Sequence, residues 1–330
     1  MSMRSLNLPE DFKMLSQLTI DTFQYPENES WSVQSDHQEN ITDMFESAKK
    51  MWPILRLAQL ISPALRDIIR GYIWEQEGQP GGMIIMQRQN KTNSWKITNV
   101  AVLPKFRRRG IARSLVEASL RFISQRGGEM ATLDVISGNF PAYTLYQKFG
   151  FEHYNSHHRF NYSEENLLSE SPLPDGYTIS KLQSMAWLPQ FELAKQITPA
   201  EVQLYEPVTE SHYNLGYGLV GLRTLLMKLS GMKIKRVTIR TNNDGNIIAF
   251  GRYHLRTRTG GVNNIGLSVH PEHADAVPYL LSFLLNTALR LSPNRRIEFS
   301  IPSWQTQILA AVSETNSTKQ YEYHSMGIIL

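Results

Sequence analysis

The sequence has 330 residues, 41% of them hydrophobic, which is enough for two domains of ordinary size, each with its own core. Its 34 basic and 30 acidic residues give a net charge of +4, too small for a protein whose whole surface binds nucleic acid. The chain has no cysteine, which excludes disulfides, thiolate metal sites and a thiol nucleophile.

The first sixty residues are predicted to form a short strand and two helical segments. We expect a strand over Met3–Asn7 and a helix from near Pro9, because a proline followed by two acidic residues is typical of a first helical turn. A polar segment, Asn28–His37, then breaks the pattern. From about Gln38 to Leu60 apolar residues recur at helical spacing, so this helix should belong to the core or to a lid.

Three β-rich runs follow, at 68–76, 81–89 and 94–103. They are separated by turn residues, and this arrangement predicts an antiparallel meander. After Gly110 the apolar spacing becomes helical, and a pair of glycines at 127 and 128 ends the helix. The remaining elements predicted for this half are a strand at 129–137, a helix at 141–149, a strand region at 151–162 and an acidic, proline-containing linker at 163–176.

The second half repeats this order. Pro104 corresponds to Pro271, a displacement of 167 residues. The same displacement superposes the turn Glu77-Gly78 on the turn Asp244-Gly245. A displacement of 166 residues carries the strand at 131–137 onto 297–303. These matches favour an internal duplication over the alternative of two unrelated α/β halves.

An arginine-rich turn separates the third strand of the meander from the next helix. Between Lys105 and Arg109 lie four positive charges and no acid, and Gly110 follows. Backbone amides at a helix start have no partners and the helix dipole is positive there, so the turn is a candidate phosphate site. A glycine lets a ligand approach the backbone, because a Cβ at position 110 would stand in the way. The alternative is a solvated basic turn. A Walker-type loop is excluded, because no Gly-Lys-Ser/Thr follows four residues after a first glycine, and a dinucleotide-binding loop fits poorly, because it needs three spaced glycines and a parallel βαβ unit.

Two motifs occur in order along this part of the chain. Arg107–Ala112 fits the pattern Arg/Gln-x-x-Gly-x-Gly/Ala and follows the strand sequence "VAV" and a proline. The stretch "NFPAYTLYQKFGF" supplies the second motif downstream. From about Ile69 to Phe151 the chain therefore resembles the GNAT superfamily of N-acetyltransferases. The matching positions of the second motif are Asn139, Ala142, Leu145, Tyr146, Gly150 and Phe151.

The resemblance implies an α/β fold of the α+β type, with two GNAT-like domains. Each would be a mixed, largely antiparallel central sheet flanked by helices. It implies a GNAT acetyl-CoA-binding catalytic domain at 1–162, a linker at 163–176 and a degenerate GNAT-like domain at 177–330.

The resemblance also implies which residues hold acetyl-CoA, the acetyl donor, with no metal involved. The "VAV" strand would offer backbone groups to the pantetheine arm, the arginine–glycine turn would bind the phosphates, and Asn139 would bind the arm further along. The cofactor-binding residues expected on this basis are Val100, Ala101, Val102, Arg107, Arg108, Arg109, Gly110, Ile111, Ala112, Arg113 and Asn139.

Without cysteine, direct attack of an amine on the thioester in a ternary complex is the simplest chemistry. Tyr146 resembles the family's general acid, and its alternative role is core packing. Many relatives carry a glutamate as base where this chain has Lys96, which is a poor base unless desolvated. Asp134, Glu75 or a water relay are the remaining candidates. Three nearby histidines, at 153, 157 and 158, lack the pattern of a metal site.

The second half keeps the order of elements but loses the site residues. Its turn, "HPEHADAV", has acids in place of the arginines and glycine, and acids repel an anion. Gln305 falls on Asn139, and Val312 falls on Tyr146. We therefore expect one working and one degenerate domain.

The function indicated is N-acetyl transfer from acetyl-CoA to a primary amine. Alternatives are a non-catalytic acetyl-CoA sensor or scaffold, and nucleic-acid binding through Arg107–Arg113, for which only one aromatic is nearby. The expected partner is a small-molecule amine or peptide acceptor, with neither nucleic acid nor a membrane, and a homodimer is left open. Without a signal peptide or apolar span near the start, a cytoplasmic location is expected.

Overall fold

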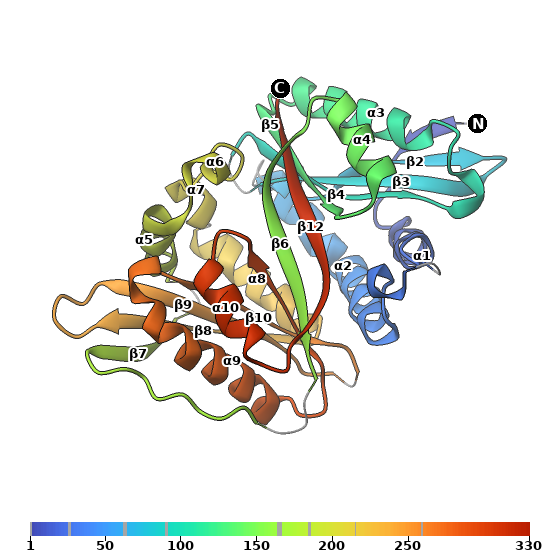
Figure 1. Ribbon diagram of the computed structural model, residues 1–330. Coiled ribbons are helices and arrows are strands. Elements are labelled where there is room, and N and C mark those ends of the chain that lie inside the picture. The colour runs from blue at the N-terminus through green and yellow to red at the C-terminus, as the bar shows by residue number, and fades with distance from the viewer. Residues whose placement is uncertain are drawn as a thin grey trace. The chain divides into compact units, whose positions relative to one another are not determined.

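The chain forms two compact units in the computed structural model (Figure 1). Unit 1 comprises Met1–Tyr154 and His324–Leu330, and unit 2 comprises Asn155–Tyr323. The structure describes residues 2–25, 28–61, 65–89, 92–163, 167–183, 186–214, 216–258 and 260–330.

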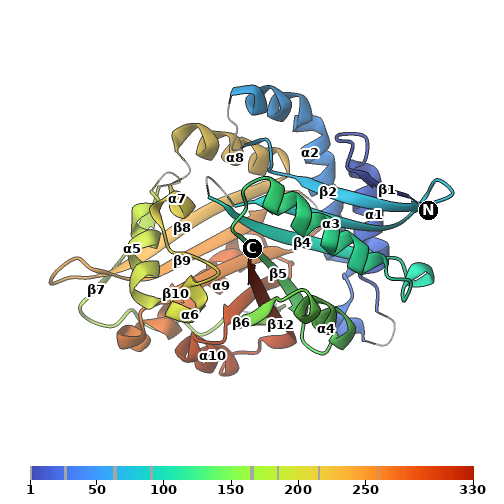
Figure 2. The same ribbon diagram turned by 90° about the horizontal axis from the view of Figure 1, so that it is seen from above.

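Unit 1 is built on a mixed sheet with the strand order β1-β2-β3-β4-β5, and the end of β12 lies next to β5. The first four strands are antiparallel neighbours, and β5 is parallel to β4. Helix α3 covers one face of this sheet and α1 the other (Figures 1 and 2). The elements are β1 (Ser2–Ser5), α1 (Phe12–Thr22), α2 (Ser35–Ile61), β2 (Arg70–Gln76), β3 (Gln79–Arg88), β4 (Ser94–Val102), α3 (Ile111–Gln125), β5 (Met130–Ile136), α4 (Phe140–Lys148) and β6 (Glu152–Tyr162).

The core of unit 1 lies between the sheet and α3. Trp95 on β4, Leu115 on α3 and Leu133 on β5 are almost completely buried in it. The helical spacing of apolar residues after Gly110 thus becomes the buried stripe of α3, as predicted. Gly127, with φ +69°, takes the left-handed conformation that ends such a helix.

Unit 2 has the strand order β6-β11-β10-β9-β8-β7. Strands β7 to β10 are antiparallel neighbours, β11 is parallel to β10, and β6 is antiparallel to β11. The elements are β7 (Tyr177–Leu182), α5 (Leu188–Ile197), α6 (Ala200–Gln203), α7 (Glu210–Tyr213), α8 (Tyr217–Leu229), β8 (Met232–Thr241), β9 (Ile247–Arg256), β10 (Asn263–Val269), α9 (Val277–Leu291), β11 (Ile297–Pro302), α10 (Thr306–Ser313) and β12 (Thr318–Ile329).

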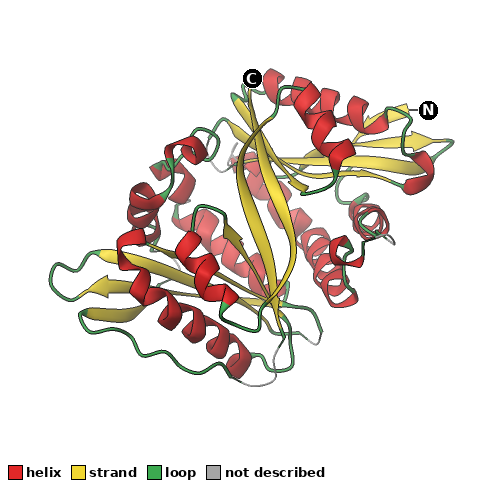
Figure 3. Cartoon of the chain, viewed as in Figure 1, coloured by secondary structure: helices red, strands yellow, loops and turns green. Residues whose placement is uncertain are grey.

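The same succession of elements occurs twice along the chain, as the sequence repeat predicts. Each half runs strand, helices, three antiparallel strands, helix, parallel strand, short helix and final strand. The two Glu/Asp-Gly turns that the repeat superposes both connect antiparallel strands. Their glycines, Gly78 and Gly245, have φ of 76° and 70°. The predicted fold class is confirmed: each unit is a mixed, largely antiparallel sheet with flanking helices (Figure 3).

The final strands of the two sequence halves are exchanged. Residues 157–162 of β6 pair with β11, and Phe160 and Tyr162 lie in the core of unit 2. In return, Met326 of β12 lies in the core of unit 1, and the Leu330 N–H donates to the Glu129 carbonyl at 2.9 Å. Each unit is therefore completed by the last strand of the other sequence half.

The exchange explains why the units differ from the sequence halves. Unit 1 ends at Tyr154, within β6, whereas the sequence predicts a domain end at residue 162 because β6 continues to that point. Within the predicted linker 163–176, Leu168 and Leu173 pack against the core of unit 2, and residues 164–166 lie outside the described residues. The division into 1–162, 163–176 and 177–330 stays a prediction about the sequence halves.

Candidate active site

Strands β4 and β5 separate part-way along their length. Their parallel register ends at the pair Ile97 and Leu133, although β4 continues to Val102 and β5 to Ile136. The pairing of β4 with β3 shifts by one residue at Thr98, which is the mark of a β-bulge. A bulge bends the strand that carries it, so β4 turns away from β5 and an opening forms between them.

The backbone of β4 presents polar groups to this opening. The Leu103 N–H donates to the Gly81 carbonyl on the β3 side at 2.9 Å. Because successive residues of a strand direct their backbone groups to opposite edges, those of Val100 and Val102 are directed away from β3. These are two of the residues that the sequence predicts to contact the pantetheine arm. Ala101, between them, is buried.

The start of α3 lies beyond the end of β4, at the open end of the gap. Gly110 precedes the helix with φ +77°, and the first helical bond runs from the Ser114 N–H to the Gly110 carbonyl at 3.0 Å. The amides of Ile111, Ala112 and Arg113 are the first of the helix and have no intrahelical acceptor. They face the place where an anion would bind.

The reason for the glycine is conformational. A Cβ added to Gly110 would meet no protein atom within 4 Å, so crowding within the protein does not select glycine. The positive φ does, because side chains other than glycine rarely adopt it. The preceding Arg108 also has a positive φ, of 65°, which makes the turn tight.

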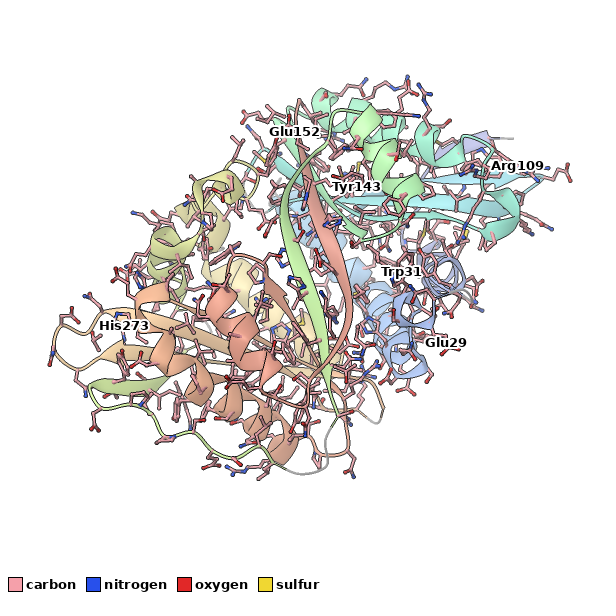
Figure 4. The ribbon with its side chains drawn as sticks, in the orientation of Figure 1. Glu29, Trp31, Arg109, Tyr143, Glu152 and His273 are labelled. Atoms are coloured by element: carbon pink, nitrogen blue, oxygen red, sulfur yellow. The ribbon has the colours of Figure 1, made fainter. Side chains whose placement is uncertain are left out.

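The arginines of the turn fall into two groups. Arg107 Nε donates to the Val102 carbonyl, and its Nη2 donates to the Thr22 carbonyl, both at 3.1 Å. Its guanidinium therefore joins the end of α1 to the end of β4. Arg108, Arg109 and Arg113 are exposed, and Figure 4 shows Arg109 at the surface of unit 1. Arg107 is exposed too, but its guanidinium is bonded to the backbone and holds the turn in place, whereas Arg108, Arg109 and Arg113 can reach a bound phosphate.

Asn139 caps α4 at the open end of β5. Its side-chain oxygen accepts the Ala142 N–H at 3.4 Å, which leaves the amide NH₂ as the donor for a ligand. The adjacent Gly138, with φ +92°, lies so close to Trp31 that an added Cβ would be 3.1 Å from the indole ring. Trp31, labelled in Figure 4, and its edge-to-face neighbour Tyr25 come from the α1–α2 connection. The sequence patterns pointed to neither residue.

Tyr146 lies on α4 within the core of unit 1 and is 6% exposed. Burial raises the pKa of its phenol above the usual value, and the nearby Tyr25 phenol raises it further. The phenol is therefore protonated at neutral pH and can act as a donor. Its ring also packs edge-on against Phe151, with centroids 6.0 Å apart.

The carboxylates considered as bases have different surroundings. Glu75 is paired with Arg4 at 2.9 Å on β1 and β2, at the far edge of the sheet from β5. Asp134 on β5 is paired with Lys96 on β4 at 2.8 Å. Within the described ranges, His, Cys, Asp and Glu form no group of three or more that could hold a metal.

At the corresponding opening in unit 2, two glutamine side chains bond to the strand backbone. The parallel pairing of β10 with β11 ends at Asn264 and Glu298, so these strands also separate. The amide oxygen of Gln305, a residue only 1% exposed, accepts the Val269 N–H at 3.3 Å, and Gln307 Nε2 donates to the Val269 carbonyl at 3.2 Å. Val269 corresponds to Val102 in the repeat. The two glutamines thus take the N–H and the carbonyl of Val269, whereas in unit 1 the Val102 carbonyl accepts from Arg107.

Part of unit 1 matches a known protein family. Residues 24–151 match the model of the acetyltransferase (GNAT) family. This part of the chain is a GNAT domain. The match covers the α1–α2 connection, the opening, the arginine–glycine turn and Tyr146.

A protein of similar sequence supports the GNAT assignment. An N-alpha-acetyltransferase of Saccharolobus solfataricus is 35% identical over 69 residues, which are 21% of this chain and 41% of that relative. The chain therefore spans less than half the length of this relative.

Solved structures extend the similarity in fold to the whole chain. A tandem GNAT protein from the clavulanic acid biosynthesis pathway matches with a TM-score of 0.66 and 13% identity, over 99% of this chain and 98% of its own. A GCN5-related N-acetyltransferase from Sphaerobacter thermophilus matches with a TM-score of 0.62 and 13% identity, over 99% and 95%. At such identities the similarity is one of fold. Both halves of the chain thus have the tandem GNAT fold. Among the described residues, no helix combines the length and apolarity needed to cross a membrane.

Proposed function

We propose that the protein is an N-acetyltransferase that transfers the acetyl group of acetyl-CoA to a primary amine. The observation that carries the proposal is the opening between β4 and β5 in a GNAT domain, with a glycine-started helix and exposed arginines at its open end. Such a helix start binds phosphate through its free amides and its dipole. An extended, amide-containing arm suits the backbone groups of Val100 and the N–H of Val102, which are directed away from β3, while the Val102 carbonyl accepts from Arg107.

The residues present fit acetyl-CoA as a substrate. The α3 amides with Arg108, Arg109 and Arg113 would hold the phosphates, and the Asn139 amide would bind the pantetheine arm. The thioester then lies deeper in the opening, away from the phosphates. Acetyl-CoA supplies the activated acetyl group, and the protein orients it and handles the protons.

The reaction proposed is direct attack in a ternary complex. The amine nitrogen forms a bond with the thioester carbonyl carbon and gives up one N–H proton to a base, and a backbone N–H of β4 near Val100 stabilises the negative oxygen. The carbon–sulfur bond then breaks, sulfur keeps the electron pair, and Tyr146 gives it a proton. The products are the N-acetyl amine and free coenzyme A.

An amine screen tests this function. Acetyl-CoA would be incubated with a peptide bearing a free α-amine, with glucosamine and with spermidine, and free thiol would be measured. The peptide is included because the S. solfataricus relative is an N-alpha-acetyltransferase. We expect thiol release that depends on one of these amines. Tight binding of acetyl-CoA with no transfer to any amine would favour the sensor function instead.

Replacing Gly110 with leucine is expected to abolish acetyl-CoA binding while the fold persists. The side chain would occupy the space in front of the α3 amides, and the strained backbone would change the turn. Gly127→Leu is the matched control, because Gly127 has φ +69° and equally open surroundings at the other end of α3. Calorimetry should show binding lost only in the first variant; equal affinities in well-folded Gly110→Leu and wild-type protein would exclude the site.

A stoichiometry of one acetyl-CoA per chain is expected. In unit 2 the backbone N–H and carbonyl of Val269 are bonded by Gln305 and Gln307, and the turn lacks the glycine and the arginines. Titration calorimetry on the full chain measures this number directly. Two sites per chain, or one site that persists in Gly110→Leu, would contradict the assignment of the site to unit 1.

A further inference from the structure

Three side chains from three strands meet beside the opening of unit 1. Lys96 Nζ on β4 lies 2.8 Å from Asp134 Oδ2 on β5. The Ser325 hydroxyl on β12 donates to Asp134 Oδ1 at 2.8 Å. Each carboxylate oxygen of Asp134 therefore has one donor, from the strand on either side of β5.

Asp134 is the first residue of β5 beyond the paired part of the two strands. The register ends at Ile97 and Leu133, so the opening starts at Asp134. Leu133 and Val135 are buried in the core on the α3 face, and side chains alternate along a strand. Asp134 therefore lies on the opposite face, the one against which α1 packs.

This position is at the closed end of the opening. Val100 is three residues from Ile97, about 10 Å along the strand, since each strand residue advances about 3.3 Å. A substrate arm that enters at the α3 turn and runs past Val102 and Val100 has its reacting end toward Asp134. Tyr146 on α4 belongs to the core cluster that includes Leu133 and Val135, and its phenol interacts with that of Tyr25 from the α1–α2 connection.

The carboxylate can accept a further hydrogen bond. A carboxylate has about four lone-pair positions, and the two donors described here occupy two of them. About a third of the Asp134 side chain is exposed (34%), so a third donor can approach. An amine N–H is such a donor.

We propose that Asp134 is the residue that accepts the proton of the attacking amine, with Lys96 and Ser325 as the residues that position it; this rests on the proposed acetyl transfer. As the amine nitrogen bonds to the carbonyl carbon, one N–H proton passes to a carboxylate oxygen of Asp134. The electron pair of the breaking carbon–sulfur bond goes to sulfur, which takes its proton from Tyr146. Solvent later removes the proton from Asp134 and restores that of Tyr146, so the step balances.

The arrangement gives the second half of the sequence a part in this reaction. Ser325 belongs to the exchanged end of β12, which is part of unit 1. Glu75, the other carboxylate considered from the sequence, is held by Arg4 at the far edge of the sheet. Asp134 is therefore the candidate proton acceptor, and the exchanged strand β12 supplies one of its hydrogen-bond donors.

Two substitutions that break the same ion pair test the assignment. Asp134→Asn removes the proton acceptor with little change in shape, whereas Lys96→Met removes the ammonium and keeps the carboxylate. With the best amine of the peptide, glucosamine and spermidine panel, we expect Asp134→Asn to lower kcat by roughly 10²- to 10⁴-fold. The acetyl-CoA dissociation constant should stay within about threefold, because Asp134 lies away from the phosphate site. Lys96→Met should lower kcat by a smaller factor, because it keeps the carboxylate that accepts the proton and removes one of the two donors that position it.

Each outcome distinguishes the inference from the proposed function. Near-normal kcat in Asp134→Asn would overturn the inference while wild-type transfer upholds the function. Equal losses in both variants, with equally lowered melting temperatures, would also overturn it, since the pair would then be structural. Asp134→Glu keeps a carboxylate and should retain more activity than Asp134→Asn; the reverse order would count against a proton acceptor. A wild-type protein that transfers acetyl to none of the three amines overturns both.

Discussion

Replacing Tyr146 with phenylalanine is expected to lower turnover by roughly 10²-fold or more, the scale of general acid catalysis. The substitution removes the hydroxyl but keeps the ring that packs against Phe151 in the core. Burial raises the pKa of the Tyr146 phenol, and a thiolate leaving in the same desolvated surroundings also has a raised pKa, so the two groups stay matched for proton transfer. Acetyl-CoA affinity should change little, because the phosphates are held at the far end of the opening.

Steady-state kinetics on a confirmed amine, with calorimetry for acetyl-CoA, measure both quantities. Tyr143→Phe is the matched control: it removes a hydroxyl from the same helix, and its ring lies beside that of His324, with centroids 5.8 Å apart. It should keep turnover within a few-fold. If Tyr146→Phe does the same, Tyr146 is a packing residue and solvent protonates the thiolate.

Removing the last seven residues, His324–Leu330, is expected to unfold unit 1 and abolish acetyl-CoA binding. Met326 is completely buried in the unit 1 core, and truncating a buried methionine to alanine alone costs about 2–5 kcal/mol of unfolding free energy. Loss of the whole segment also exposes the edge of β5. A typical domain is stable by about 5–15 kcal/mol, so little stability would be left.

Melting followed by circular dichroism, together with acetyl-CoA titration, tests the truncation. A chain ending at Ile328 is the control, because the two residues it lacks, Ile329 and Leu330, are 59% and 41% exposed. The control should melt close to the full chain. A chain of residues 1–323 that binds acetyl-CoA with full affinity would show that the exchanged strand is dispensable.

Each unit thus contains strand residues from the other half of the sequence. A fragment cut at residue 162 contains the phosphate turn and Tyr146 but lacks Met326 and Ser325. The fragment 163–330 lacks Phe160 and Tyr162 of the unit 2 core. Each half of the sequence therefore lacks core residues of the unit that it mainly forms.

Much of the fold and part of the site could be predicted from the sequence because they depend on local patterns. Helical and alternating spacing predicted the meander and α3, and glycines at 110 and 127 marked the two ends of that helix. The same local order, strand, basic turn, glycine and helix, is present in the structure, and the phosphate site that it predicts stays a prediction. The repeat at 167 residues predicted two equivalent successions of elements.

Only the tertiary structure decided which strand completes which sheet and which side chains meet. The sequence of β6 or β12 alone does not specify the strand with which it pairs, because strand pairing depends on the edge available after the rest of the sheet has formed. Contacts between residues far apart in the sequence have the same origin: Ser325 with Asp134, Arg107 with Thr22, and Gln305 with Val269. Spacing along the chain fixes local conformation, whereas the partners of a polar side chain are fixed by the packing of distant segments.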